Sequence, residues 1–274
     1  MENLIQKIKE KKEFSGIEDS LVREKLDETL RQNNSLKNFL GRDRSEGYKK
    51  IVKLTREKLH RAYGVFQNED KTKVIELINE LEKTEDLHEI LSIHKIILSS
   101  VVSTKERLPF YEQLYTKIFS ITGWPKPIVD LGCGFNPMSF PFMGLDEVDY
   151  IAYDINKEDI KILNRYFEIM GDDLNGEAAL INLEDCDFKK IPKSDIGFIF
   201  KVFDVLDRKD HKKSEDIITS LNCNWIVASF STQTVSGKKM KHPYRGWMNR
   251  MLERLGYEFK IIEFENEIFY LIKK

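Results

Sequence analysis

The sequence predicts an α/β protein in which a helical N-terminal domain precedes a seven-stranded, mostly parallel sheet. Up to about residue 122, apolar residues recur at three- and four-residue spacing, as in Leu77, Ile78 and Leu81, which is typical of amphipathic helices. After Trp124, short apolar runs alternate with stretches of helical length, and this indicates parallel strand–helix–strand units. Only Glu265 and Asn266 separate the last two strands, so these strands must form an antiparallel hairpin.

We therefore divide the chain into two domains, residues 1–122 with five to seven helices and residues 123–274 with the sheet. The expected strands are the apolar runs PIVDL (127–131), VDYIAYDI (148–155), EAALINL (177–183), DIGFIFKVF (195–203), NWIVASF (224–230), YEFKIIEF (257–264) and EIFYLIKK (267–274). A terminal hairpin is unusual in a dinucleotide dehydrogenase. It is the expected ending of a Rossmann-like class I methyltransferase.

Composition excludes several classes of protein. The formal charge is -2, so no global basic field indicates a nucleic-acid partner. The three cysteines form no C-x-x-C pair, so we expect no metal and reduced thiols, as in a cytosolic protein. The N-terminus lacks an apolar signal region, and no apolar run approaches the roughly 20 residues that span a bilayer. We expect a cytoplasmic protein that does not enter membranes.

The stretch IVDLGCGFNP, residues 128–137, predicts a cofactor-binding turn after the first strand. Gly132 and Gly134, which flank Cys133, let the backbone approach a ligand closely. A nicotinamide dinucleotide would require a third glycine where Pro137 stands, so that fingerprint is incomplete. Asp130 would repel a pyrophosphate but can accept a hydrogen bond from an ammonium group. S-adenosylmethionine carries such an ammonium and no phosphate, and it is the cofactor that we expect.

The next two strands end in side chains that suit the rest of this cofactor. Asp154, followed by Ile155, can accept both ribose hydroxyls. A polar residue after the third strand, Asn182, Glu184 or Asp185, can meet the adenine amino group, with Leu183 against the ring. Three strand ends with suitable side chains favour S-adenosylmethionine over a nicotinamide cofactor or no cofactor.

From about residue 45 to the C-terminus, the chain resembles the Arm/Rmt family, the aminoglycoside-resistance 16S rRNA methyltransferases that modify guanine N7. The resemblance spans both domains and is carried, in order, by REKLHRAYGVF (56–66), STKERLPFYEQLYTKIF (103–119), DLGCGFNPMSF (130–140), AYDIN (152–156), FIFKVFDVLDRKD (198–210) and SFSTQTVSGKKMK (229–241).

The resemblance implies a monomeric enzyme that methylates guanine N7 in the decoding site of 16S rRNA, within the 30S subunit. It also implies that Arg107 reaches from the helical domain to the methionine carboxylate, where a guanidinium fork suits a carboxylate. Two positions depart from the family pattern. Ser231 replaces the proline of an SFP motif, and Asp204 replaces a proline after the fourth strand. Both departures lie near the expected target-base pocket.

The chemistry at guanine N7 requires little from the protein. N7 has a free lone pair, so attack on a sulfonium methyl group needs positioning and no general base. We assign Lys201, Phe230 and Ser231 to the target-base pocket, with Lys201 contacting a phosphate or guanine O6. Asp204 either balances Lys201 or caps the next helix. The segment FKVFDV lacks the Asn/Asp-Pro-Pro-Tyr loop expected for adenine-N6 chemistry.

Local charge predicts an RNA-binding surface despite the neutral total. Residues 228–252 contain no acidic residue, and we assign Lys238, Lys239, Lys241, Arg245 and Trp247 to RNA binding next to a loop at Ser236 and Gly237. The first 61 residues hold 16 Lys/Arg against 11 Asp/Glu, and residues 62–100 hold four against eight. This segregation indicates a basic face on the helical RNA-recognition domain.

Two other functions fit parts of the sequence. A small-molecule methyltransferase of the same fold would require a closed, apolar lid formed by the N-terminal helices. A non-catalytic RNA-binding protein would require a cofactor pocket that binds nothing.

Overall fold

The computed structural model describes residues 2–11, 14–15, 17–62, 71–206, 211–234 and 238–274. Parts of three family motifs, residues 63–66, 207–210 and 235–237, lie outside these ranges, as does the predicted loop at Ser236 and Gly237. Within the described residues, no helix combines the length and the apolar character needed to cross a membrane.

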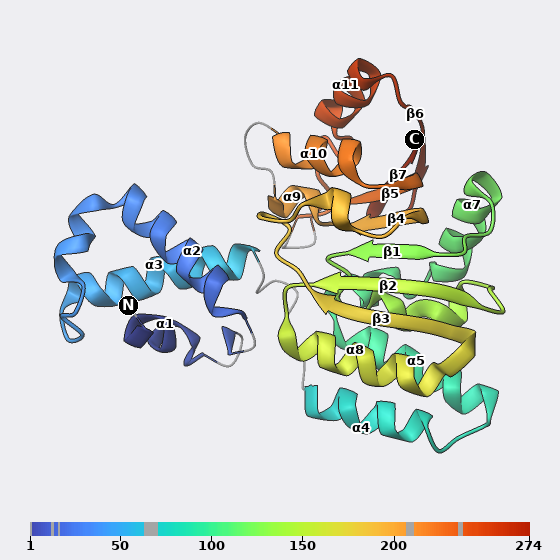
Figure 1. Ribbon diagram of the computed structural model, residues 1–274, viewed down its shortest axis with the longest axis horizontal. Helices are drawn as coiled ribbons and strands as arrows, with labels where there is room; N and C mark the ends of the chain where they lie inside the picture. The colour runs from blue at the N-terminus through green and yellow to red at the C-terminus, as the bar shows by residue number, and fades with distance from the viewer. Residues whose placement is uncertain (1, 12–13, 16, 63–70, 207–210, 235–237) are drawn as a thin grey trace.

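A seven-stranded mixed sheet forms the centre of the chain, as predicted (Figure 1). Its order is β3-β2-β1-β4-β5-β7-β6. The bounds are β1 (Ile128–Leu131), β2 (Val148–Asp154), β3 (Leu174–Leu180), β4 (Ser194–Phe200), β5 (Cys223–Ser231), β6 (Glu258–Glu263) and β7 (Glu267–Lys273). β1 to β5 pair in parallel, whereas β7 is antiparallel to both β5 and β6, so the predicted hairpin is confirmed.

Helices cover both faces of the sheet (Figure 1). The central strands β1 and β4 are therefore buried on both sides. One core includes residues of α4 (Lys71–Leu81), α5 (Leu87–Ser100), α7 (Tyr111–Thr122), η4 (Asn136–Phe142) and α8 (Lys157–Met170). The opposite core includes residues of η6 (Phe188–Lys190), α9 (Phe203–Leu206), α10 (Lys212–Ser220) and α11 (Gly246–Leu255). The short helices α6 (Val102–Arg107) and η5 (Gly171–Asp173) complete this part of the chain.

The first helices pack around a separate core. α1 (Glu2–Lys9), α2 (Asp19–Gln32), η2 (Asn34–Phe39) and α3 (Glu46–Ala62) bury their apolar side chains against one another, and Figure 1 shows them beside the sheet. By contrast, α4 to α7 share a core with the sheet. The two apolar cores divide between α3 and α4, whereas the domain boundary after residue 122 stays a prediction.

A few contacts join this N-terminal unit, α1 to α3, to the rest of the protein. Ile17 forms an isolated antiparallel bridge with Asn156. The ammonium of Lys25, on α2, lies 2.7 Å from a carboxylate oxygen of Glu184. α3 also contacts α9. These contacts place the N-terminal unit next to the carboxyl ends of β2, β3 and β4.

The packing of β3 against α8 generates a stability prediction. A Cβ atom added at Gly176, in β3, would lie 2.2 Å from a ring carbon of the buried Phe167. We expect Gly176→Ala to lower the free energy of unfolding by about 1–3 kcal/mol, because the ring must leave its packed position. Urea unfolding measures this change. In Phe167→Leu the same glycine substitution is expected to cost less, and an equal cost in both backgrounds would contradict the steric explanation.

Candidate active site

A cavity opens at the carboxyl ends of the parallel strands, where ligands bind in open α/β sheets. It lies between α6, the turn after β1, the end of β2, the segment after β3, and the segment from β4 into α9. The predicted site residues that line it are Arg107, Gly132, Cys133, Gly134, Asp154, Ile155, Asn182, Leu183 and Lys201.

The turn after β1 adopts the conformation for which glycine is required. Gly132 and Gly134 have φ angles of 70° and 48°, a left-handed backbone that side chains rarely tolerate. A Cβ atom at Gly132 would also lie 2.6 Å from a methyl carbon of Val202, which lines the cavity. The amide of Gly132 donates to the carbonyl of Tyr153 at 2.8 Å, and this bond holds the turn against β2.

Asp154 stands at the end of β2 and organises the same turn. Its Oδ2 accepts a hydrogen bond from the amide of Gly134 at 2.9 Å. Its Oδ1 accepts from the amides of Ile155 and Asn156 at 2.7 and 3.0 Å. A carboxylate has about four acceptor positions, and three are used here, so this fixed group can accept about one further hydrogen bond from a ligand.

Asp130 is fully buried beneath the turn and is incompletely paired. Its Oδ2 accepts hydrogen bonds from the Tyr150 hydroxyl at 2.7 Å and the Asn136 amide at 2.9 Å. Its Oδ1 is buried with no hydrogen-bond partner. Burial raises the pKa of Asp130 from 3.8 to about 6, although both donors and the charge of Arg107 act in the opposite direction. An orphaned carboxylate oxygen of this kind suits a cationic ligand.

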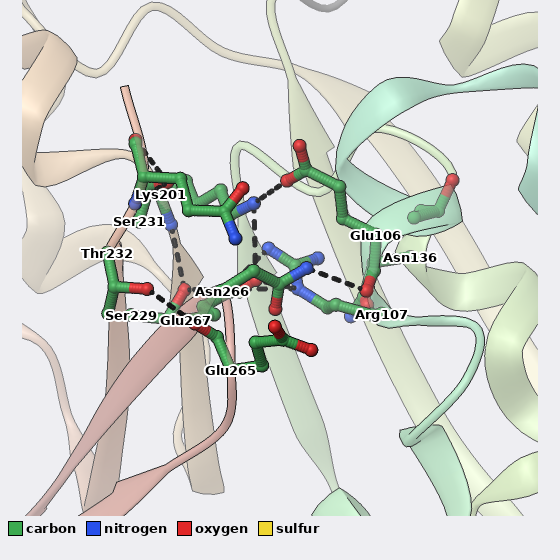
Figure 2. A network of polar contacts seen from close by, with 12 residues as sticks. Glu106, Arg107, Asn136, Lys201, Ser229, Ser231, Thr232, Glu265, Asn266 and Glu267 are labelled. Atoms are coloured by element: carbon green, nitrogen blue, oxygen red, sulfur yellow. Dashed lines mark hydrogen bonds and ion pairs between the residues drawn. The ribbon is translucent and has the colours of Figure 1, made fainter. Parts of the chain in front are cut away.

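Arg107 and Glu267 form a buried ion pair beside Asp130 (Figure 2). The Nε of Arg107 lies 3.0 Å from each carboxylate oxygen of Glu267, and its guanidinium lies 4.8 Å from the centre of the Phe200 ring. Nη2 comes within 2.9 Å of Glu267 Oε1, yet it is buried without a hydrogen bond. Arg107 therefore retains a donor that a ligand carboxylate can use.

Glu267 also fixes the far side of the cavity. The Ser229 hydroxyl donates to its Oε1, and Lys201 Nζ lies 3.3 Å from its Oε2. Burial acts to raise the pKa of Glu267, but Arg107 and Lys201 outweigh burial and lower it. Glu267 is thus a carboxylate at neutral pH, and it is shared by two cations that both line the cavity.

Lys201 leaves the end of β4 in a left-handed conformation with φ 60°. Such a conformation is uncommon for a residue with a side chain and is often found at functional sites. Lys201 is only 8% exposed, and its Nζ lies 2.5 Å from an oxygen of Glu106 (Figure 2). The prediction that Asp204 balances Lys201 is wrong, because Glu106 and Glu267 hold the ammonium.

Two residues assigned to the target-base pocket lie elsewhere. Phe230 is fully buried, with its ring against Phe203, Trp247 and Tyr270, so it cannot stack on a base. Ser231 does not line the cavity. Its hydroxyl donates to the carbonyl of Gln233 at 2.8 Å and closes a local turn. Both assignments are corrected, because β5 directs these side chains into the core or the turn.

Two residues assigned to RNA binding make internal contacts instead. Arg245 forms a two-pronged ion pair with Asp204, at 2.6 and 3.1 Å, and its side chain is 11% exposed. The Trp247 ring stacks on His211 with centroids 3.8 Å apart. Asp204, which replaces the family proline, thus has a partner in Arg245. By contrast, Lys238, Lys239 and Lys241 are exposed, as an RNA-binding role requires.

The segment after β3 resolves the predicted alternatives for the adenine side. Asn182 and Leu183 line the cavity, whereas Glu184 and Asp185 do not. The carboxylate of Glu184 accepts from Lys25 and thereby joins this segment to α2. Its assignment as a cofactor contact is corrected, because the side chain points toward the N-terminal unit.

Sequence reasoning missed Glu106 and Glu267. Glu106 precedes Arg107 in the predicted TKER motif, but nothing in the motif distinguishes a cavity-facing carboxylate from a solvated one. Glu267 begins an apolar strand, and its register opposite Ser231 places it at the ligand-binding edge of the sheet. A charge at the start of a buried strand was the signal that could have identified it.

The raised pKa of Asp130 generates a pH prediction. The pKa of Asp130 in the folded protein, about 6, exceeds its ordinary value of 3.8 in the unfolded chain. Its contribution to the free energy of unfolding is therefore most favourable below pH 3.8 and falls as pH rises to about 6. The gap corresponds to about 3 kcal/mol. We expect the stability of Asp130→Asn relative to wild type to increase by about that amount between pH 4 and pH 7.

Urea unfolding at several pH values measures this difference. Asp159, whose pKa burial also raises to about 6, is present in both proteins and cancels. Asp146→Asn, at an exposed carboxylate, is the control and should show no such trend. A flat difference between Asp130→Asn and wild type would contradict the burial explanation.

Comparison with known proteins identifies the family. Residues 35–271 match the ribosomal RNA methyltransferase (FmrO) family. A 16S rRNA (guanine(1405)-N(7))-methyltransferase of Proteus mirabilis is 28% identical over 82% of this chain and 85% of its own length. A Micromonospora echinospora protein of the same name is 26% identical over 81% and 82%.

Two solved structures share the fold over the whole chain. The 16S rRNA methyltransferase RmtF, in complex with S-adenosyl-L-homocysteine, has a TM-score of 0.77 at 20% identity and covers 100% of this chain and 97% of its own. The 16S rRNA methylase RmtB has a TM-score of 0.72 at 23% identity, with coverages of 100% and 98%. The family match covers α3 of the N-terminal unit and the whole sheet except its last residues, and the predicted methyltransferase is confirmed: the chain belongs to the ribosomal RNA methyltransferase (FmrO) family.

Proposed function

We propose that this protein transfers a methyl group from S-adenosylmethionine to N7 of a guanine in the decoding site of 16S rRNA. The substrate is the 30S subunit, the enzyme acts as a cytoplasmic monomer, and the product confers resistance to aminoglycosides. The name shared by the Proteus and Micromonospora relatives supports the nucleobase and the atom.

One observation carries the cofactor assignment. A buried guanidinium nitrogen, Arg107 Nη2, lacks a hydrogen-bond partner at the cavity, and a buried carboxylate oxygen, Asp130 Oδ1, lacks one beneath the glycine turn that lines the cavity. The amino-acid end of S-adenosylmethionine carries an ammonium and a carboxylate, which satisfy an acceptor and a donor respectively. Asp154 would accept a hydrogen bond from a ribose hydroxyl, and Leu183 would pack against adenine with Asn182 beside it.

The residues present suit methyl transfer to a neutral ring nitrogen. S-adenosylmethionine supplies an electrophilic methyl group when bound. The protein holds the base in line and excludes water, and it need not remove a proton because N7 carries none. Lys201 lies between Glu106 and Glu267, so it is positioned to donate a hydrogen bond to guanine O6.

Two basic surfaces support recognition of RNA. Lys238, Lys239 and Lys241 are exposed close to the carboxyl end of β5, near the cavity. A groove on the N-terminal unit is lined by Lys7, Lys11, Arg44, Lys49, Lys53 and Arg56, with only Asp43 and Glu57 as acidic residues. The small-molecule alternative required a closed apolar lid, whereas α1 to α3 bury their apolar side chains in their own core.

The function is tested with purified 30S subunits and labelled S-adenosylmethionine. We expect incorporation into 16S rRNA at one guanine, located by chemical cleavage at N7-methylguanine and primer extension. Transfer to a small molecule without transfer to 30S would contradict the proposal. Binding of S-adenosylmethionine measured by calorimetry separates an enzyme from a non-catalytic RNA-binding protein.

Arg107 and Asp130 generate a binding prediction. Arg107→Lys and Asp130→Asn are each expected to weaken S-adenosylmethionine binding by about 10- to 100-fold, because each removes a charge-assisted contact. Calorimetry measures both constants. Arg165→Lys, at an exposed arginine on α8, is the matched control and should bind like wild type. Unchanged affinity in both site variants would refute the cofactor assignment.

The basic loop generates a salt prediction. Replacing Lys238, Lys239 and Lys241 by Ala should weaken 30S binding and flatten its salt dependence by about 0.7–0.9 per lost phosphate contact, with cofactor affinity unchanged. Filter binding at several salt concentrations measures the slope. The control removes the same number of positive charges by replacing Lys189, Lys190 and Lys193, which are exposed and precede β4, by Ala. If both triple variants behave alike, the loop has no specific role.

A further inference from the structure

Two groups of opposite charge lie side by side, and one of them, Lys201, lines the cavity. Glu106, on α6, and Lys201, at the end of β4, reach toward each other, and their carboxylate oxygen and ammonium are 2.5 Å apart (Figure 2). The side chain of Lys201 is 9% exposed and that of Glu106 is 39% exposed. Lys201 is therefore the fixed member of the pair, and Glu106 is the member that an incoming group can reach.

Lys201 does not depend on Glu106 to keep its place. Glu267, which is fully buried, holds the same ammonium from the other side at 3.3 Å. The backbone amide of Lys201 also donates to the carbonyl of Ser229 at 3.1 Å. Glu106 is anchored separately, because its carbonyl accepts from the Asn266 amide at 3.0 Å. The Lys201 ammonium and the Glu106 backbone thus keep their positions while the Glu106 carboxylate exchanges partners.

This donor and acceptor match one edge of guanine. A flipped base is read by hydrogen bonds to its Watson–Crick edge. On guanine that edge offers the O6 acceptor next to the N1 and N2 donors. On adenine it offers the N6 donor next to the N1 lone pair, which is the reverse order. O6 also neighbours N7, so a base whose O6 meets Lys201, which lines the cavity, presents N7 to the cavity.

We propose that Glu106 determines the specificity for guanine, by accepting hydrogen bonds from N1–H and the N2 amino group while Lys201 donates to O6. The inference rests on the proposed function and adds the residue that rejects adenine. A carboxylate facing the lone pair of adenine N1 leaves two acceptors opposed, and a site built this way rejects the wrong base strongly.

The test compares two substrates. The methylated guanine is first located with the wild-type enzyme, and 30S subunits are then prepared with adenine at that nucleotide. Single-turnover rates of methyl transfer are measured on both particles for wild type and Glu106→Gln. We expect the guanine-to-adenine ratio of rates to fall at least tenfold in Glu106→Gln, because an amide can donate to adenine N1 as well as accept. Glu112→Gln, at an exposed glutamate on α7, should keep the wild-type ratio.

Each outcome decides the matter. An unchanged ratio in Glu106→Gln overturns the proposal, as does a variant whose defect is only a weaker affinity for S-adenosylmethionine by calorimetry. Glu106→Asp, which keeps the charge, provides a second variant and should retain the ratio at a reduced rate. If wild type methylates neither particle, the proposed function itself fails, and that failure is seen before any variant is compared.

Discussion

The buried ion pair between Arg107 and Glu267 is the interaction on which the site depends. It joins α6, which precedes the sheet in the chain, to β7, which ends it. Removing one partner would leave an uncompensated charge in the core, so the pair keeps the two segments together. The same carboxylate also holds Lys201, and α6 carries Glu106. The Glu267 carboxylate therefore positions both Arg107, which is proposed to bind the cofactor, and Lys201, which is proposed to bind the base.

Several backbone positions with positive φ and several buried polar atoms without partners lie at this site. Gly132, Gly134 and Lys201 adopt left-handed backbone conformations, and Asp130 carries a buried oxygen without a partner. The left-handed backbone of Lys201 and the orphaned oxygen of Asp130 each cost stability in the folded protein alone. A ligand that supplies the missing hydrogen-bond partners offsets that cost, so binding of the cofactor is expected to stabilise the fold.

The sequence allowed the sheet, its hairpin and the cofactor turn to be predicted, because these features depend on local patterns. Apolar runs identify strands, and the two glycines indicate a left-handed backbone that other residues rarely adopt. The errors concern side-chain direction and long-range partners. Phe230 and Trp247 were predicted to contact RNA, because the sequence does not show whether an aromatic residue near a basic segment is buried. Glu267 pairs with a residue 160 positions away, and the core shared by α4 to α7 with the sheet depends on packing that helical periodicity does not reveal.

The separate core of α1 to α3 has a consequence for how this protein can diverge. Its apolar cluster is distinct from those around the sheet, and Ile155, which lines the cavity, packs against it. The exposed groove on the N-terminal unit can therefore change in charge while the cavity keeps its shape, whereas substitutions in the core beside Ile155 reach the cavity. In this arrangement, the surface proposed to recognise the RNA can change while the methyl-transfer site is retained.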